Sequence, residues 1–233
     1  MKWMLAKLIQ ITPLTNTIVR IELEPEEYIP YRAGQYLQIR IGEKTGYFSI
    51  ANAPLGTKKY ELHIRHEQTN LFSQSLLKHL QEFGTLELQL PMGKAHVGFL
   101  DRVKPIIFIA GGTGFAQIKS VIEQLLYRDD SRIFECYWGA KEQSDLYWQK
   151  RLQDWQEHVK TFEHLALFEG KKSYGIIEAI QNRHSHHLNE FQFVISGPFE
   201  MVYNYRDQLV ALGVLGSSIH SDAFEFESRA ASS

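Results

Sequence analysis

The chain has 233 residues, of which 44% are hydrophobic and 22% are charged, enough for ordinary hydrophobic cores. This length suits two domains of roughly 100 residues each. A formal net charge of −2 gives no general attraction to nucleic acid or to anionic lipid, so we expect neither as a partner.

Residues 1–100 alternate apolar and polar side chains with a period of two. This alternation is typical of strands with one face in a core and the other in water. One helix is expected over about residues 70–80, where Leu71, Leu76 and Leu80 recur at helical spacing. The clearest predicted strands are 18–23, 36–41, 60–65 and 86–90. We therefore expect residues 1–100 to form an antiparallel β-barrel domain.

After residue 100 the pattern changes to strands that alternate with helices. Residues 105–110 are apolar throughout, as in a strand covered on both faces. Further strands are expected at 133–138, 159–168, 191–196 and 217–226, and helices at 115–127, 144–158 and 201–212. This alternation predicts a second, α/β domain over residues 101–233, with a parallel sheet between helices.

A glycine-rich loop, Gly111-Gly112-Thr113-Gly114, joins the apolar strand to the first helix of this second half. Ligands of open α/β sheets bind at such strand ends, glycines admit close backbone approach, and a helix N-terminus attracts phosphate. The loop is not a Walker A motif, and Gln117 stands where a full dinucleotide fingerprint has its third glycine. By itself the loop could also be a turn without a ligand, although a ligand-binding loop is favoured.

Two further loops are predicted at the same sheet edge. They are Gly139-Ala140-Lys141 and Gly197-Pro198-Phe199-Glu200-Met201. Since the carboxyl ends of parallel strands meet at one edge, we expect the three loops to form one dinucleotide-binding cleft.

In the first half, Tyr47-Phe48-Ser49 places two aromatic rings and a hydroxyl on one segment. One interpretation is barrel core with an exposed serine. The other is an apolar surface for a planar heterocycle, with the Ser49 hydroxyl reaching a ring nitrogen.

Other features favour structural interpretations. The sequence contains no run of about 18 apolar residues, so we expect no membrane insertion. Its single thiol suits a protein of the reducing cytoplasm. Cys136 lies in a predicted strand, where we expect it to be buried. The stretch His184-Ser185-His186-His187 is interpreted as a polar loop rather than a metal site.

With these motifs the sequence resembles the bacterial NAD(P)H–flavin reductases of the ferredoxin–NADP reductase superfamily. The matching segments follow in order along the chain: Arg32-Ala33-Gly34-Gln35-Tyr36, Phe48-Ser49, Leu62-His63-Ile64 with Asn70-Leu71, residues 110–115, Tyr137-Trp138-Gly139, residues 197–201 and Asp222-Ala223-Phe224. The resemblance implies a flavin-binding barrel followed by a pyridine-nucleotide domain, with the flavin ring between them.

The resemblance also implies roles for individual residues. Ser49 would bond the ring near N5, Thr113 would place the nicotinamide, and both are the candidate catalytic residues. Tyr47 and Phe48 would shape the flavin site, supported by backbone of His63, Ile64 and Arg65. The nucleotide would be framed by Gly111, Gly112, Gly114, Phe115, Gly139, Ala140, Lys141, Gly197, Pro198, Phe199, Glu200 and Met201, with Phe224 over the ring edge.

Two departures from the family pattern bear on the cofactor. Gly46 stands where the family usually has an arginine, whose contact to a flavin phosphate is worth about 1.5–3 kcal/mol. This substitution favours a dissociable flavin, whether FAD, FMN or riboflavin. Ser196 stands where many members of the superfamily have a cysteine near the nicotinamide.

The predicted function is hydride transfer from NADH or NADPH to a flavin, which then leaves in reduced form for an acceptor protein, a ferric complex or oxygen. No acidic residue ends the strand at 133–138 to select NADH, so we expect both nucleotides to be used. The alternatives are an FAD-containing reductase component of an oxygenase, deoxysugar or ferric-reducing system, and a non-catalytic flavin-binding module. A monomer or weak dimer is expected.

Overall fold

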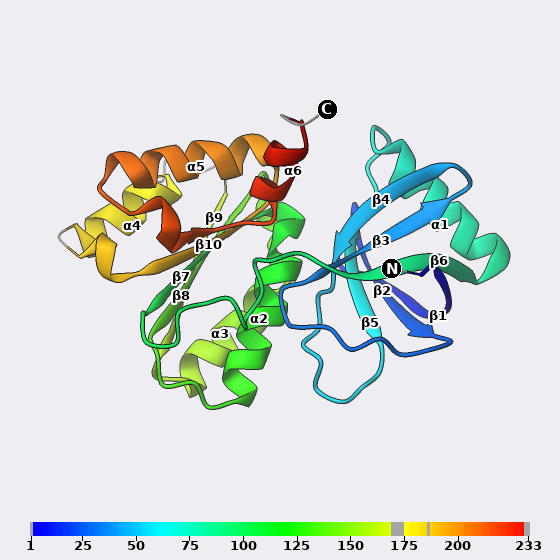
Figure 1. Cartoon of the computed structure of the whole chain (residues 1–233), viewed down its shortest axis with the longest axis horizontal. Coiled ribbons are helices and arrows are strands. Elements are labelled where there is room, and N and C mark those ends of the chain that lie inside the picture. Colours follow the sequence, from blue (N-terminus) through cyan, green and yellow to red (C-terminus); the bar gives the residue numbers. More distant parts are fainter. Residues whose placement is uncertain (1, 169–174, 186, 231–233) are drawn as a thin grey trace.

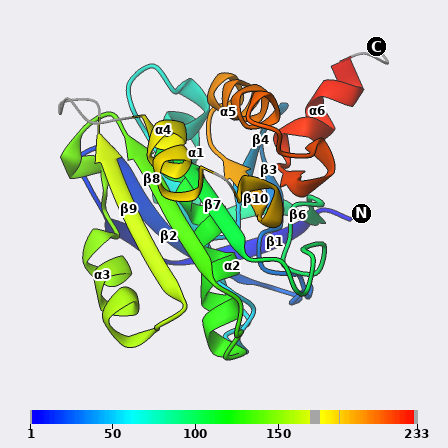
Figure 2. The same cartoon turned by 90° about the vertical axis from the view of Figure 1, so that its left-hand side faces the viewer.

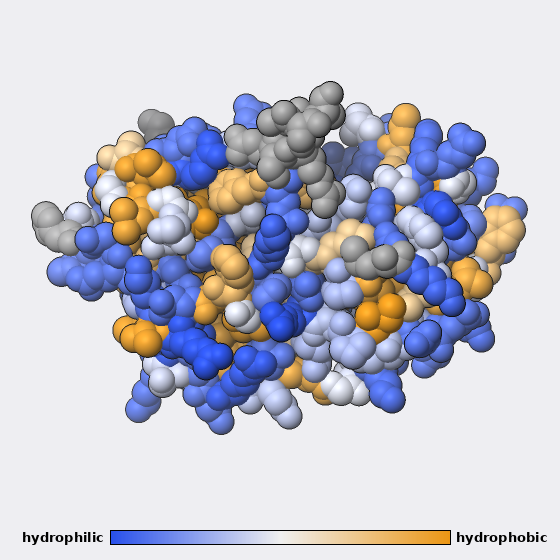
Figure 3. All heavy atoms as spheres, in the orientation of Figure 1, coloured by the Kyte–Doolittle hydropathy of each residue, from blue (hydrophilic) through white to orange (hydrophobic). Residues whose placement is uncertain are grey.

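The computed structural model describes residues 2–168, 175–185 and 187–230, and the side chains up to residue 226 (Figure 1). Two lobes lie side by side, an antiparallel sheet of six strands and a parallel sheet of five strands flanked by helices. This confirms the predicted fold class. Polar and apolar residues are interspersed over the face shown in Figure 3.

The antiparallel sheet forms a barrel. Its strands are β1 (Met4–Pro13), β2 (Ile18–Pro25), β3 (Tyr36–Ile41), β4 (Lys44–Ser49), β5 (Tyr60–Arg65) and β6 (Thr85–Met92), in the order β4-β3-β6-β1-β2-β5. The end strands β4 and β5 approach each other, as a curled sheet requires. Apolar residues at alternate positions, such as Ile21 and Leu23, fill the interior.

Helix α1 (Leu71–Phe83) packs on the barrel through the buried side chains of Leu76 and Leu80. The Asn70 side chain caps its first turn by accepting from the backbone N–H of Ser73 at 3.1 Å. Gly84, with a φ of +68°, ends the helix in the left-handed conformation. The helix is thus slightly longer than the segment predicted over 70–80.

The parallel sheet consists of β7 (Ile106–Gly111), β8 (Phe134–Ala140), β9 (Phe162–Phe168), β10 (Gln192–Ser196) and β11 (Ile219–His220), in the order β11-β10-β7-β8-β9. Helices α2 (Phe115–Tyr127) and α3 (Gln149–His158) cover one face, and α4 (Ile176–His184) and α5 (Phe199–Ala211) cover the other (Figure 2). Every residue of β7 is buried, as its unbroken apolar sequence predicts.

The end of the chain differs from its predicted single strand over 217–226. Only Ile219 and His220 pair with β10, and helix α6 (Ala223–Ala230) follows. The chain leaves the sheet because the carboxylate of Asp222 accepts hydrogen bonds from the backbone N–H groups of Lys94 and Ala95, at 2.9 and 3.0 Å.

Two histidines of the predicted polar loop are described. His184 ends α4, which was not predicted, and its Nε2 lies 2.9 Å from Glu135 Oε2. His187 pairs with Glu190, and His186 lies outside the described residues. Among the residues that the structure describes, no cluster of side chains suits a metal ion, and no helix is long and apolar enough to cross a bilayer.

Helix α2 joins the two lobes through polar side chains. Lys119 Nζ donates to the Ala51 carbonyl at 3.0 Å, and Ser120 Oγ donates to the Asn52 carbonyl at 2.8 Å. Gln117, at the place of the missing third glycine, donates to the Gly34 carbonyl at 3.0 Å. The residue that departs from the dinucleotide fingerprint therefore binds the barrel.

Candidate active site

A cavity of about 880 Å³ opens where the barrel meets the carboxyl ends of the parallel strands. This volume is typical of a cofactor site. Fifteen of the predicted site residues line it: Tyr47, Phe48, Ser49, His63, Arg65, Gly111, Gly112, Thr113, Gly114, Gly139, Ala140, Lys141, Gly197, Pro198 and Met201. The structure thus brings the aromatic segment of the barrel and all three predicted loops to one space.

Four of the remaining predicted residues lie behind or beside this space. Ile64 is in the barrel core, and Phe115 is fully buried and stacks on Trp138 with ring centroids 4.1 Å apart. Phe199 and Glu200 are exposed in the first turn of α5. Strand and helix periodicity explains these positions, because neighbours of a lining residue point elsewhere.

The fifth, Phe224, does not line the cavity and packs on Tyr203, with ring centroids 5.9 Å apart. Phe226, two residues later, lies instead against Tyr47 of the barrel and Phe199 of α5, at 5.5 Å from each ring. The helical conformation of α6 moves the aromatic contact from the predicted position to Phe226.

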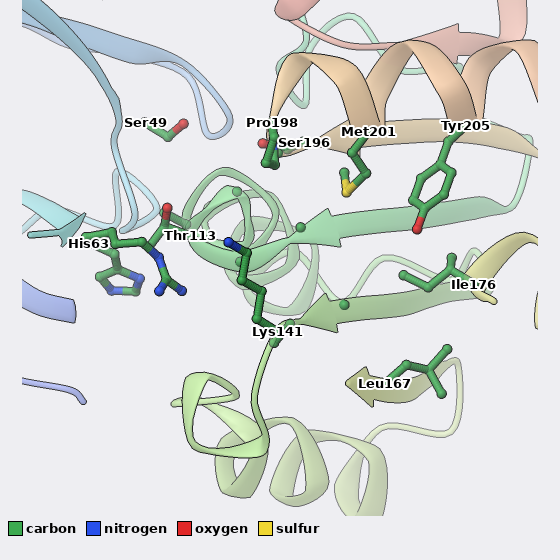
Figure 4. A pocket seen from close by; sticks show the side chains of 18 of the residues that line it. Ser49, His63, Thr113, Lys141, Leu167, Ile176, Ser196, Pro198, Met201 and Tyr205 are labelled. Atoms are coloured by element: carbon green, nitrogen blue, oxygen red, sulfur yellow. The ribbon is translucent and has the colours of Figure 1, made fainter. Parts of the chain in front are cut away.

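Several lining residues carry no sequence motif. They are Glu67, Ala116, Leu167, Phe168, Gly175, Ile176 and Tyr205, while Ser196, the position of the superfamily cysteine, also lines the cavity. Leu167 and Phe168 end β9, so the strand-end rule could have found them. Ile176 and Tyr205 come from helices α4 and α5, and no local signal marks them (Figure 4).

The glycines mainly let two loops pack together. A Cβ atom on Gly114 would collide with the backbone of Ser196 and Gly197, and one on Gly111 would collide with Met201. Gly112, by contrast, has open space beside it, with a φ of +52° and nothing nearer than Arg65, at 3.8 Å from its Cβ position. Gly111 and Gly114 thus build the cavity wall, and Gly112 offers backbone to the cavity.

Serine and threonine hydroxyl groups reach the cavity from Ser49, Thr113 and Ser196. Ser49 ends β4 of the barrel and Thr113 lies in the loop after β7 (Figure 4). Neither side-chain hydroxyl has a hydrogen-bond partner among the described residues, although both line the cavity. Beside the aromatic Tyr47 and Phe48, free hydroxyls suit the polar edge of a planar heterocycle, so these residues fit a flavin.

The charge of the Arg65 side chain in the cavity is neutralised by ion pairs. Arg65 pairs with Glu67 at 2.7 Å and with Asp145 at 2.9 Å, and these bonds outweigh burial and raise its pKa. Burial lowers the pKa of His63, so this side chain is neutral at pH 7. The exposed Lys141 extends back toward Thr113 (Figure 4).

Cys136 and Gly46 have structural explanations. Cys136 is fully buried, and burial raises the pKa of its thiol, so it is neither a nucleophile nor part of the cavity. Gly46 faces Phe72, a residue of α1 whose ring stacks on Phe48 with centroids 6.1 Å apart. The departure at position 46 is therefore built into the packing of α1 on β4.

Comparisons with known proteins agree with this architecture. Residues 108–207 match the oxidoreductase NAD-binding domain family. The chain is 30% identical to reductase component 1 of terephthalate 1,2-dioxygenase from Comamonas sp, over 89% of this chain and 63% of that protein. It is 28% identical to an NAD(P)H-flavin reductase from Vibrio harveyi, over 87% of this chain and 90% of that protein.

The fold is also similar to that of a ferredoxin NADP+ reductase from Neisseria gonorrhoeae. That structure aligns with a TM-score of 0.80 and 19% identity, over 95% of this chain and 98% of that one. Together with the flavin reductase relatives, these likenesses confirm the resemblance predicted from the motifs. Residues 108–207 thus carry an oxidoreductase NAD-binding domain, and the chain as a whole is similar to NAD(P)H-flavin reductases.

Proposed function

We propose that this protein is an NAD(P)H:flavin oxidoreductase that takes a hydride from NADH or NADPH and releases reduced flavin. The observation that carries the proposal is the pair of unpartnered hydroxyls, Ser49 and Thr113, in one cavity between barrel and glycine-lined strand ends. We assign flavin binding to the domain of residues 1–100 and nucleotide binding to the domain of residues 101–233.

The residues present divide the cavity into two sides. Tyr47, Phe48 and Ser49 would hold the flavin against the barrel. Gly112, Thr113 and the loops that begin at Gly139 and Gly197 would hold the dinucleotide. When bound, the two cofactors supply the redox chemistry, a hydride passing from the nicotinamide to the flavin.

The task of the protein is to bind and orient. Two rings held face to face react far faster than free ones, because their relative position no longer has to be found by collision. The Ser49 hydroxyl would hydrogen-bond the polar edge of the flavin, and Thr113 would bond the nicotinamide side. His63 is neutral and bonded to Glu61 and Tyr147, so we assign it no proton-transfer role.

The flavin is proposed to come and go as a substrate, since Gly46 supplies no cation for a phosphate. The reduced flavin would then serve an acceptor protein, a ferric complex or oxygen. A cytoplasmic location fits the single, buried thiol, and we propose a monomer or weak dimer.

A second candidate rests on the relatives. One relative is the reductase component of a dioxygenase, terephthalate 1,2-dioxygenase, and this chain spans only 63% of that relative's length. A reductase component with tightly bound FAD would use the same cavity. A non-catalytic flavin-binding module is the third possibility, for which Gly46 is the strongest argument.

Steady-state oxidation of NADH and NADPH, with and without added flavin, separates these functions. Oxidation that requires added flavin supports a flavin reductase. Oxidation without added flavin, by a yellow protein that keeps its colour on dialysis, supports the reductase component. No oxidation in either case supports the binding module.

A further inference from the structure

Alternate side chains of β5 form a row of contacts with the α/β domain. Since successive strand residues point to opposite faces, residues 61, 63 and 65 share one face. Their contacts are Glu61 Oε1 to Lys119 Nζ at 3.1 Å, His63 Nδ1 to Tyr147 OH at 3.1 Å, and Arg65 Nη2 to Asp145 Oδ2 at 2.9 Å. We name these three pairs the β5 ladder.

The first pair is deep in the interface. Lys119 is 2% exposed and its ammonium reaches Glu61, Glu123 and the Ala51 carbonyl, at 3.1, 2.8 and 3.0 Å. Burial alone would raise the pKa of Glu61, but the hydrogen bond from His63 and the charge of Lys119 lower it to about 2. Glu61 is therefore ionised at neutral pH and only accepts hydrogen bonds.

In the second pair the direction of the hydrogen bond is fixed. Because the Glu61 carboxylate accepts from Nε2 of His63 at 2.9 Å, the neutral ring carries its proton on Nε2. Nδ1 must then accept from the Tyr147 hydroxyl. The Tyr147 ring packs edge-on against Trp138 at 5.0 Å, and Trp138 Nε1 donates to the Gly112 carbonyl at 2.9 Å. The ladder thus reaches the glycine-rich loop.

Arg65 of the third pair lines the cavity. The Arg65 guanidinium is held on the barrel side by Glu67 and on the other side by Asp145, whose side chain is 10% exposed. Its Nη2 lies 3.8 Å from the Cβ position of Gly112. Arg65 therefore connects the barrel to the segment of the α/β domain that carries Asp145, and its guanidinium lies beside Gly112 of the loop that carries Thr113.

We propose that the β5 ladder sets the spacing between the two cavity walls, and that Arg65 and Asp145 are a positioning pair for hydride transfer. Buried polar pairs add little net stability compared with apolar packing, but any other arrangement leaves them unpaired, so they select one orientation. The catalytic part of this inference rests on the proposed function. Displacing a reacting group by 1 Å can slow a reaction about a hundredfold.

The spacing can be measured without any ligand. The one cysteine, Cys136, is fully buried, so spin labels on Lys44→Cys of the barrel and Lys150→Cys of α3, both exposed positions, report the distance between domains. Asp145→Asn removes the charge and keeps the shape. Glu87→Gln is the matched control, because it breaks the pair with Arg40, at 2.9 Å, inside the barrel. The distance distribution should broaden or shift in Asp145→Asn only.

Kinetics then separate positioning from folding. In Asp145→Asn we expect kcat to fall about tenfold, with the dissociation constant for flavin and the midpoint of unfolding nearly unchanged. Arg65→Gln should lower kcat to a similar extent. In the double variant kcat should fall no further than in the more strongly affected single variant, because the two residues act as one unit.

The outcomes are distinct. An unchanged distance distribution in Asp145→Asn overturns the ladder as a spacing device. A changed distribution with an unchanged kcat overturns its role in positioning the reaction. If the wild-type protein oxidises no NAD(P)H with any flavin, the proposed function and the catalytic role fail together, while the spin labels still decide whether the ladder sets the spacing.

Discussion

A Cβ atom on Gly46 would lie 2.5 Å from Cε1 of Phe72, so the Phe72 ring occupies the space in which a side chain at position 46 would begin. Glycine is required here for space, since α1 presents the Phe72 ring to β4, where it stacks on Phe48. The family arginine and this aromatic packing therefore exclude each other.

The first prediction concerns stability. Gly46→Arg alone should destabilise the protein by about 1–3 kcal/mol, because the new side chain overpacks a filled site. Urea unfolding measures the change. A variant as stable as the wild type would show that the Phe72 ring moves aside without cost.

The second prediction concerns flavin choice. In the double variant Gly46→Arg with Phe72→Ala, the arginine has room and can pair with a flavin phosphate. The dissociation constant of FMN should then be at least about tenfold lower than that of riboflavin. Phe72→Ala alone opens the same space without a charge and should show no such preference. Fluorescence titration of both flavins gives the ratio, and equal ratios in the two variants would contradict this account.

The third prediction concerns Ser49. Ser49→Ala should slow flavin reduction about tenfold or more, since a positioned polar contact to the reacting ring is lost. Ser75→Ala is a suitable control, because Ser75 is an exposed residue of α1 that donates to the Leu71 carbonyl. Pre-steady-state absorbance at saturating substrates measures the step. Wild-type rates in Ser49→Ala would remove Ser49 from the mechanism.

The fourth prediction concerns pH. The pKa of Glu61 is about 2 in the folded protein, against an ordinary value of 4.5. A lowered carboxyl pKa stabilises the folded state fully above the unfolded value and loses that contribution as the pH falls from about 4.5 to 2. The contribution is on the order of 3 kcal/mol. Glu61→Gln should therefore be less stable than wild type at pH 7, with a difference that shrinks toward pH 3.

Urea unfolding at several pH values tests this prediction. Glu82→Gln, on the exposed side of α1, should track the wild type at every pH. A constant difference between wild type and Glu61→Gln across this range would show that the charge of Glu61 is not what stabilises the interface.

The fifth prediction concerns the nucleotide. Gly139 and Ala140 end β8 and Lys141 follows, so no acidic residue ends this strand to select NADH, and kcat/KM for NADH and NADPH should differ by less than about a hundredfold. Lys141→Ala should lower kcat/KM for NADPH more than kcat/KM for NADH. A larger preference in the wild type would contradict this interpretation.

Much of the fold could be predicted from local pattern. Period-two alternation indicates the barrel, and the apolar run at 105–110 followed by the helix over 115–127 predicts β7 and α2. The loops of the cavity follow, because parallel strands end at one edge.

The remainder depends on tertiary contacts. Asp222 pulls the chain out of the sheet to reach Lys94 and Ala95, so α6 replaces a strand and Phe226 rather than Phe224 meets Tyr47. The close packing of the glycine loops is equally invisible in a local pattern, because it is set by residues far apart in the chain.

The central claim is that a nicotinamide and a flavin meet in the cavity between Ser49 and Thr113. Anaerobic mixing of the protein and oxidised flavin with NADH deuterated at C4 tests it most directly, by the loss of the visible flavin absorbance. We predict bleaching that requires the protein and is slower than with unlabelled NADH. Bleaching at the rate of the protein-free mixture would contradict the account.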